Sequence, residues 1–211
     1  TKLLTDGEEG RYVASSIFES KMRNQYKNKD FVILYRTNAQ SRAFEDSLRK
    51  KNIPYRVYGG LSFYQRKEIK DIIAYLRLVV NKSDEEAFKR IINFPVRGIG
   101  QTSVDKLIVE SKKRGVPIFD IAKNINDFNV GIGSKIRSKI SDFILSIEKL
   151  RLMLDESNAF EITEEVIKSS GIYKLYKDEE TIESISRMQN IEELLNGVKD
   201  FVDTQARITQ S

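Results

Sequence analysis

Residues 31–60 read FVILYRTNAQSRAFEDSLRKKNIPYRVYGG, and they decide the fold expected for the start of the chain. Residues 31–35 form a continuous apolar run, which is typical of a buried strand in a parallel sheet. A helical pattern covers 40–51, Pro54 breaks it, and 55–58 has the composition of a second strand that ends at two glycines. The stretch therefore predicts a strand-helix-strand unit.

Upstream of this unit, residues 7–28 carry apolar side chains at helical spacing, and Leu3 and Leu4 could add an edge strand. A unit of this size is too short to close a sheet of its own. Residues 1–62 therefore predict an α/β fragment that is part of a larger parallel sheet.

After Gly60 the apolar period becomes helical and stays so to the end of the chain. Ser83 and Glu86 predict a capping box at the start of one of the helices. We therefore expect 63–211 to be an all-α domain and the whole chain to be mostly helical. The apolar stripes, which we assign to the core, are Ile69, Ile72, Ile73, Leu76, Val79 and Val80, then stripes within 136–154 and 182–201.

The composition excludes several kinds of chemistry. The 211 residues contain no Cys and no His, so thiol nucleophiles, Ser-His-Asp triads and sulfur- or imidazole-bound metals are ruled out. No Gly-Lys dipeptide occurs, and a phosphate-binding loop of the GxxxxGK[ST] kind is therefore absent. We assign no catalytic residue and no metal ligand. Because no apolar run could span a membrane and the start is polar, we expect a cytoplasmic protein without a membrane partner.

Charge is segregated along the sequence. Residues 1–151 hold 30 basic and 18 acidic residues, net +12, whereas 152–211 hold 6 and 13, net −7. A basic surface favours a polyanionic partner, because neutralised phosphates release counterions. The alternative is that the charges only solvate the surface.

Two Gly-Ile-Gly turns stand 33 residues apart, and each is expected to open a helix. Glycines let the backbone approach a phosphate, and the amides at a helix start add partial positive charge. The pair resembles the helix-hairpin-helix motif, which contacts duplex backbones without reading bases. Gly-x-Gly is also a common helix connector, and Arg137 stands where the first copy has Val104, which puts close packing in doubt. The candidate residues are Arg97, Gly98, Ile99, Gly100 and Lys106 for the first turn, and Gly131, Gly133, Lys135 and Lys139 for the second.

A second polar cluster, YRTNAQSR at 35–42, follows the first predicted strand. Open α/β sheets place ligands at the carboxyl ends of their strands. Arg36 and Arg42 could contact phosphates, and Asn38 could bind sugar or base. Asn38 could equally be only the N-cap of the following helix.

Taken in order, these blocks resemble superfamily 1 DNA helicases of the UvrD/PcrA/Rep type. The similarity runs nearly without gaps from residue 31 to 97 and continues more weakly to about 201. The matching blocks are YRTNAQSR (35–42), IPY (53–55), YGG (58–60), FY (63–64), RKEIKD (66–71), IIN (91–93), RGIG (97–100), SG (170–171) and RMQNIEEL (187–194).

The resemblance implies that 1–62 is the first part of a RecA-like motor domain, 2A, and that 63–211 is most of the helical 2B domain. It implies single-stranded DNA contacts at Arg36 and Asn38. It also implies duplex contacts at the first turn with Thr102 and Ser103. The parent protein would be an ATP-dependent 3′–5′ DNA helicase that uses ATP and Mg²⁺. The fragment itself lacks the Walker A and B motifs, so we expect it to hold no cofactor and hydrolyse no ATP.

Two alternatives remain. The helical part could act as an autoinhibitory or protein-docking module, with the acidic residues 152–211 facing another protein. The chain could also be a stand-alone helix-hairpin-helix DNA-binding protein, which the incomplete sheet argues against.

Overall fold

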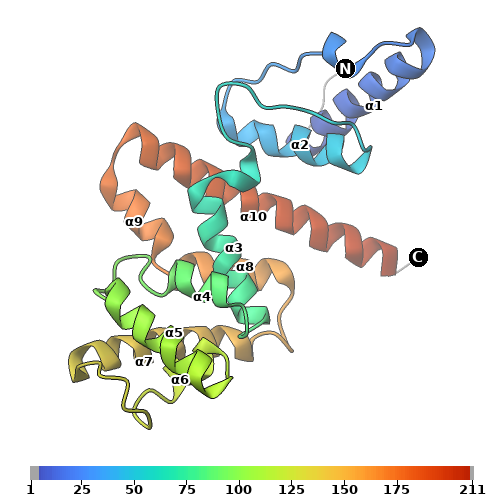
Figure 1. The fold of residues 1–211 in the computed structure, drawn as a ribbon. Helices are drawn as coiled ribbons and strands as arrows, with labels where there is room; N and C mark the ends of the chain where they lie inside the picture. Colours follow the sequence, from blue (N-terminus) through green and yellow to red (C-terminus); the bar gives the residue numbers. More distant parts are fainter. Residues whose placement is uncertain (1–4, 210–211) are drawn as a thin grey trace. The chain divides into compact units, whose positions relative to one another are not determined.

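The computed structural model describes residues 5–209, which divide into two compact units (Figure 1). Unit 1 is Thr1–Ile69 and unit 2 is Lys70–Ser211. The expected boundary at residue 62 came from the change of apolar period, and its assignment to domains 2A and 2B stays a prediction. The edge strand expected at Leu3 and Leu4 lies outside the described residues.

Unit 1 is built on two packed helices, α1 (Asp6–Asn24) and α2 (Ser41–Lys50). Their shared core contains Ala14, Ile17, Leu48 and Ile53. Gly10 makes the close contact possible, because a Cβ there would lie 2.3 Å from the backbone oxygen of Ala43. Three short 3₁₀ turns complete the unit: Asn28–Asp30, Asn38–Gln40 and Phe63–Gln65.

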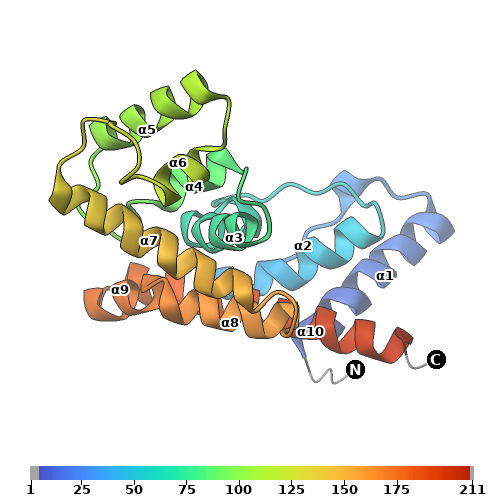
Figure 2. The same cartoon turned by 90° about the horizontal axis from the view of Figure 1, so that it is seen from below.

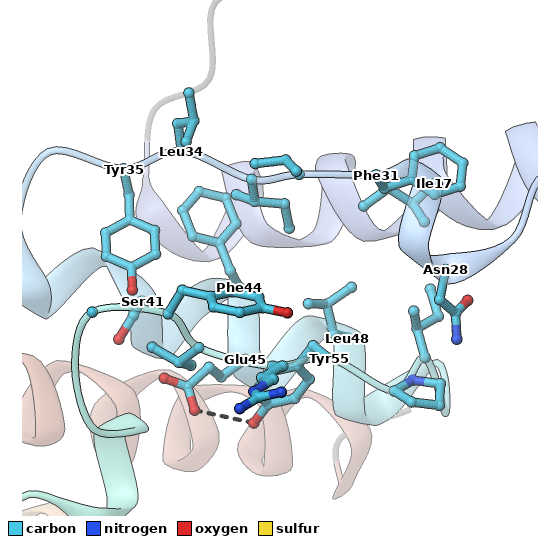
Figure 3. A pocket seen from close by; sticks show the side chains of 18 of the residues that line it. Ile17, Asn28, Phe31, Leu34, Tyr35, Ser41, Phe44, Glu45, Leu48 and Tyr55 are labelled. Carbon is cyan, nitrogen blue, oxygen red and sulfur yellow. Dashed lines mark hydrogen bonds between the residues drawn. The ribbon is translucent and has the colours of Figure 1, made fainter.

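The α/β expectation for the start of the chain is wrong, because residues 5–209 contain no strand and no sheet. Segments 31–35 and 53–58 are extended, but they line a cavity of about 730 Å³ and no backbone hydrogen bond among the described residues joins them (Figure 3). A strand needs a hydrogen-bonded partner. The run 31–35 is also not buried, since Val32 is 80% and Leu34 88% exposed. The described chain is all-helical.

Unit 2 was expected to be helical, and it is. In Figure 1 the chain passes through α4, α5 and α6 in green and returns along α7 in yellow. The helices are α3 (Lys67–Val80), which begins in unit 1, then α4 (Glu85–Ile91), α5 (Gln101–Arg114), α6 (Ile118–Lys123), α7 (Ser134–Leu152), α8 (Ala159–Ser169), α9 (Ile172–Glu179) and α10 (Ile182–Thr209).

Helix α7 is central to unit 2, where it packs against α6 and, on its other side, against α8 (Figure 2). Three fully buried rings join α4, α6 and α7. The ring of Phe88 stands edge-on to Phe119 at 6.5 Å and to Phe143 at 5.8 Å between centroids. Edge-to-face pairs of this kind stabilise a core beyond the area that they bury.

The capping box expected at Ser83 is wrong. Asp84 is the N-cap of α4, and its Oδ1 accepts the backbone N–H of Ala87 at 2.9 Å. The Ser83 N–H instead donates to Asn81 Oδ1. An Asp one residue later in the turn therefore caps a helix that begins one residue later, and its charge also suits the helix start. Within residues 5–209, no helix combines the length and apolarity needed to cross a membrane.

Candidate nucleic-acid interface

The side chain of one asparagine holds the first Gly-Ile-Gly turn in place. Asn93 Oδ1 accepts the backbone N–H of Arg97 at 2.9 Å and that of Ile99 at 3.0 Å. Ile99 is 1% exposed and anchors the turn in the core, whereas Gly98 and Gly100 are exposed. The turn is therefore held rigidly with its two glycines facing outward.

Arg97 lies inside this turn. Its Nη1 donates to the carbonyl oxygens of Ile91 at 3.0 Å and Pro95 at 3.2 Å, and its Nη2 donates to the Tyr75 hydroxyl at 2.6 Å. Its guanidinium also lies 5.2 Å from the centroid of the Phe143 ring. The group that was expected to face DNA satisfies the carbonyls at the end of α4.

The glycine turn leads directly into α5, whose N-cap is Gly100. Within the described residues, the backbone amides of Gln101 and Thr102 have no acceptor, whereas the Ser103 N–H donates to Gly100 O at 2.9 Å. The Thr102 side chain is exposed and that of Ser103 is half-buried. Free amides at a helix start form a favourable place for an anion.

The second turn has the same construction. Gly133 is the N-cap of α7, Ile132 is 7% exposed, and Gly131 has a positive φ of 61°, as Gly98 has at 73°. Arg137 does not disturb the packing. Its guanidinium donates to the carbonyls of Ile132 at 2.8 Å and of Phe128 at 3.1 Å, and to that of Ile125.

The fold brings the two turns together through their lysines. Lys106, on α5, reaches across to the second turn and donates to Gly131 O at 2.6 Å. Lys139, on α7, reaches the first turn, where a Cβ on Gly98 would lie 2.7 Å from its Nζ. Lys135 is exposed at the start of α7. Within residues 5–209, none of these three lysines has a carboxylate in ion-pair distance, so their charge is available to an anion.

In unit 1, the 35–42 loop is shaped by Gln40. Its Oε1 accepts the backbone N–H of Arg36 at 3.0 Å and of Thr37 at 3.1 Å. Thr37, not Asn38, is the residue before the 3₁₀ turn Asn38–Gln40. In the part of the chain that the structure describes, the Arg36 guanidinium and the Asn38 amide are exposed and have no hydrogen-bond partner.

Arg42 is placed differently from Arg36. It is 7% exposed, and its Nη1 lies 3.2 Å from Asp46 Oδ2 on the next turn of α2. The loop therefore presents one outward arginine and one that is held against its own helix.

Two buried charged residues of unit 1 were not assigned as site residues from the sequence, and one of them, Arg66, supports this loop. Arg66, 8% exposed, donates to the Asn38 carbonyl and the Ser41 hydroxyl, both at 2.8 Å. Glu45, 2% exposed, accepts the N–H of Phe63 at 2.9 Å and the hydroxyl of Tyr55 at 3.0 Å, the bond dashed in Figure 3. The position of Glu45 on the buried face of α2 could have indicated its role, because a buried carboxylate needs hydrogen-bond donors.

Burial shifts the pKa of two ionisable groups near these sites. Desolvation lowers the pKa of the Arg66 guanidinium, although the charges of Glu45 and Glu68 oppose it. Desolvation also raises the pKa of the Tyr75 hydroxyl against the opposing effect of Arg97. Both side chains make hydrogen bonds within the protein, Arg66 to the 35–42 loop and Tyr75 to the Phe94 carbonyl. Among residues 5–209, no group of three or more acidic side chains could hold a metal ion.

The family profile described as UvrD-like helicase C-terminal domain matches residues 2–211. The chain is 41% identical over 193 residues to the ATP-dependent DNA helicase PcrA of Bacillus subtilis, covering 92% of this chain and 26% of the relative. It is 38% identical over 208 residues to PcrA of Staphylococcus aureus strain Mu50, covering 99% of this chain and 28% of the relative. The chain thus spans between a quarter and a third of the length of these relatives.

Proposed function

Because the chain belongs to the family of UvrD-like helicase C-terminal domains, we propose that it is the DNA-binding part of an ATP-dependent 3′–5′ DNA helicase. Its own activity is sequence-independent binding. Unit 1 contacts single-stranded DNA through Arg36 and Asn38, and unit 2 contacts duplex DNA through the paired Gly-Ile-Gly turns. The whole protein uses ATP and Mg²⁺ and works in the cytosol, where its DNA substrate lies.

One observation carries the duplex assignment: two glycine turns, far apart in sequence, lie together with three lysines that have no acidic partner among the described residues. Exposed glycines, free helix amides and ammonium groups without a carboxylate partner suit phosphate oxygens, which every DNA sequence presents alike. This favours binding that depends on the backbone and therefore on salt.

The internal hydrogen bonds refine the expected contacts. Arg97 donates to three carbonyls at and after the end of α4 and to the Tyr75 hydroxyl of α3, so we assign it to positioning the turn. Arg42, which pairs with Asp46, is assigned to positioning α2. Gly98, Ile99, Gly100, Thr102 and Ser103 form the duplex-facing backbone.

The duplex assignment can be tested by adding a negative charge at Gly100, where the fold has room for a side chain. A Cβ on Gly100 would meet no atom within 4 Å, and the backbone there has φ −72° and ψ 159°. Asp and Asn are both favourable N-caps in this conformation. Gly100→Asp and Gly100→Asn should therefore both fold, while only the aspartate adds a negative charge at the first turn.

We expect Gly100→Asp to lower affinity for a duplex-single-strand junction by at least about tenfold at 0.1 M salt, and Gly100→Asn to change it much less. Fluorescence anisotropy at several salt concentrations measures both affinity and salt slope. Equal affinities for the two variants, or wild-type binding without salt dependence, would refute the duplex assignment.

A second candidate function is docking to another protein. Helix α10 is acidic in composition, yet it exposes apolar side chains: Ile182 is 90%, Phe201 58% and Ile208 62% exposed. Charge reversal at Lys106 with Lys135 distinguishes the two functions, because it should abolish junction binding and leave a contact through α10 intact.

A further inference from the structure

The two lysines that cross between the turns occupy equivalent positions in the repeat. Gly98 and Gly131 are 33 residues apart, and so are Lys106 and Lys139. Each lysine follows the second glycine of its own turn by six residues, on the helix which that turn opens. Lys106 and Lys139 are therefore the same residue of the two repeats.

The contacts are reciprocal. The ammonium group of Lys106 donates to the carbonyl of Gly131, and that of Lys139 lies close to Gly98, 2.7 Å from the place where a Cβ would stand. Both glycines have a positive φ. Each turn therefore receives its lysine from the helix of the other repeat.

After making these contacts, Lys106 and Lys139 can still bind an anion. Lys106 is exposed and uses one of its three N–H donors on Gly131 O. Lys139 is half-buried, and no carboxylate of residues 5–209 lies in ion-pair range of it. Asp105, the nearest acid in sequence to Lys106, accepts instead from Gln101 Nε2 at 2.9 Å.

We propose that the two turns form one grip with exchanged lysines. One phosphate of the duplex is bound by the first turn together with Lys139, and a second phosphate by the second turn together with Lys106. The inference rests on the proposed function, since it assigns the residues within the same duplex-binding surface. It predicts that neither turn binds phosphate normally when the opposite repeat is damaged.

Double-mutant cycles test the exchange in the 211-residue chain with a blunt DNA duplex. Gly100→Asp blocks the first turn and Gly133→Asp blocks the second, and a Cβ at either position would meet no atom within 4 Å. Each is combined with Lys106→Ala and Lys139→Ala, and every variant is checked for unaltered circular dichroism.

Each lysine substitution alone should lower duplex affinity about eightfold at 0.1 M salt and reduce the salt slope by about 0.9, as one lost phosphate contact predicts. Lys139→Ala should have no further effect in the Gly100→Asp background and its full effect in the Gly133→Asp background. Lys106→Ala should show the opposite pattern. Lys106→Arg and Lys139→Arg should retain most of the affinity.

Matched controls lie at the far ends of the same helices. Lys113 in the last turn of α5 and Lys149 in the last turn of α7 are exposed, and changing either to Ala alters net charge equally. Both should leave affinity within about twofold. If each lysine instead coupled to its own turn, or if neither coupled to a turn, the exchange would be refuted although duplex binding stood. Absent binding by the unmodified chain would refute the proposed function itself.

Discussion

At the scale of single residues, two arginines expected to contact DNA have different surroundings. Arg36 is exposed, and among residues 5–209 its guanidinium has no partner, whereas Arg97 donates to carbonyls and to the Tyr75 hydroxyl. The sequence could not separate them, because the carbonyls of Ile91 and Pro95 converge on one point only after the chain has folded.

We expect Arg97→Ala to lower the free energy of unfolding by about 2–3 kcal/mol, since several partly buried acceptors lose their donor. Arg36→Ala should change it by less than about 0.5 kcal/mol, as is usual for an exposed side chain. Arg36→Ala should instead weaken binding to single strands more than to duplex. Urea denaturation and anisotropy with both kinds of DNA measure these effects, and equal loss on both DNAs would contradict the single-strand assignment.

A second residue-scale prediction concerns the glycines of the first turn. Gly98→Ala places a Cβ 2.7 Å from Lys139 Nζ at a φ of 73°, which an L-residue adopts at a cost of about 1–2 kcal/mol. Gly100→Ala meets neither obstacle. Thermal unfolding should show a lower midpoint for Gly98→Ala than for Gly100→Ala, and a reversed order would contradict the described turn.

At the scale of elements, the start of α4 depends on Asp84. Asp84→Ala should cost about 1 kcal/mol, because the Ala87 amide loses its cap, while Ser83→Ala should cost almost nothing. Urea denaturation of the two variants separates them. A larger effect at Ser83 would contradict the assignment of the cap.

The same cap gives a pH dependence. The Ala87 backbone amide, followed by Arg77, lowers the pKa of the Asp84 carboxyl below its usual value of 3.8. A depressed carboxyl pKa stabilises the fold above the unfolded pKa, and that contribution is lost as pH falls through the folded value. Wild type should therefore lose more stability than Asp84→Ala between pH 5 and about pH 2. Parallel losses in urea denaturation across that range would contradict this role.

Helices were predictable from sequence where the apolar period was long, as in α3, α7 and α10, and at both Gly-Ile-Gly turns. Strands were not. The run 31–35 has strand composition, yet composition cannot supply the hydrogen-bonding partner that makes an extended segment a strand. Short helices such as α6 and α9 were missed, because six to eight residues carry too little periodic signal.

Within the candidate site, the sequence indicated the turns and the basic residues, since glycine spacing and charge are local properties. It could not indicate that Lys106 and Lys139 exchange turns, which depends on how α5 and α7 are brought together. The sequence also assigned no supporting role to Asn93, Glu45 or Arg66, although Asn93 and Arg66 stand in the matching blocks, because only the fold brings their backbone partners near them.

At the scale of the whole molecule, the motifs that the 211 residues lack limit the chemistry that the chain can perform alone. The 211 residues contain no Gly-Lys dipeptide and so no P-loop of the GxxxxGK[ST] kind. We expect the purified chain to release no phosphate from ATP above background, with or without single-stranded DNA. A malachite-green assay measures this, and a turnover that is lost with Arg36→Ala would contradict the expectation.

The exposed run 31–35 has a practical consequence for handling the protein. Five successive apolar residues, with Val32 and Leu34 in solvent and no proline or charge among them, form a segment that pairs readily with copies of itself. Concentrated stocks should therefore cloud slowly and bind thioflavin T. A Leu34→Lys variant, altered at a side chain that is 88% exposed, should stay clear for longer.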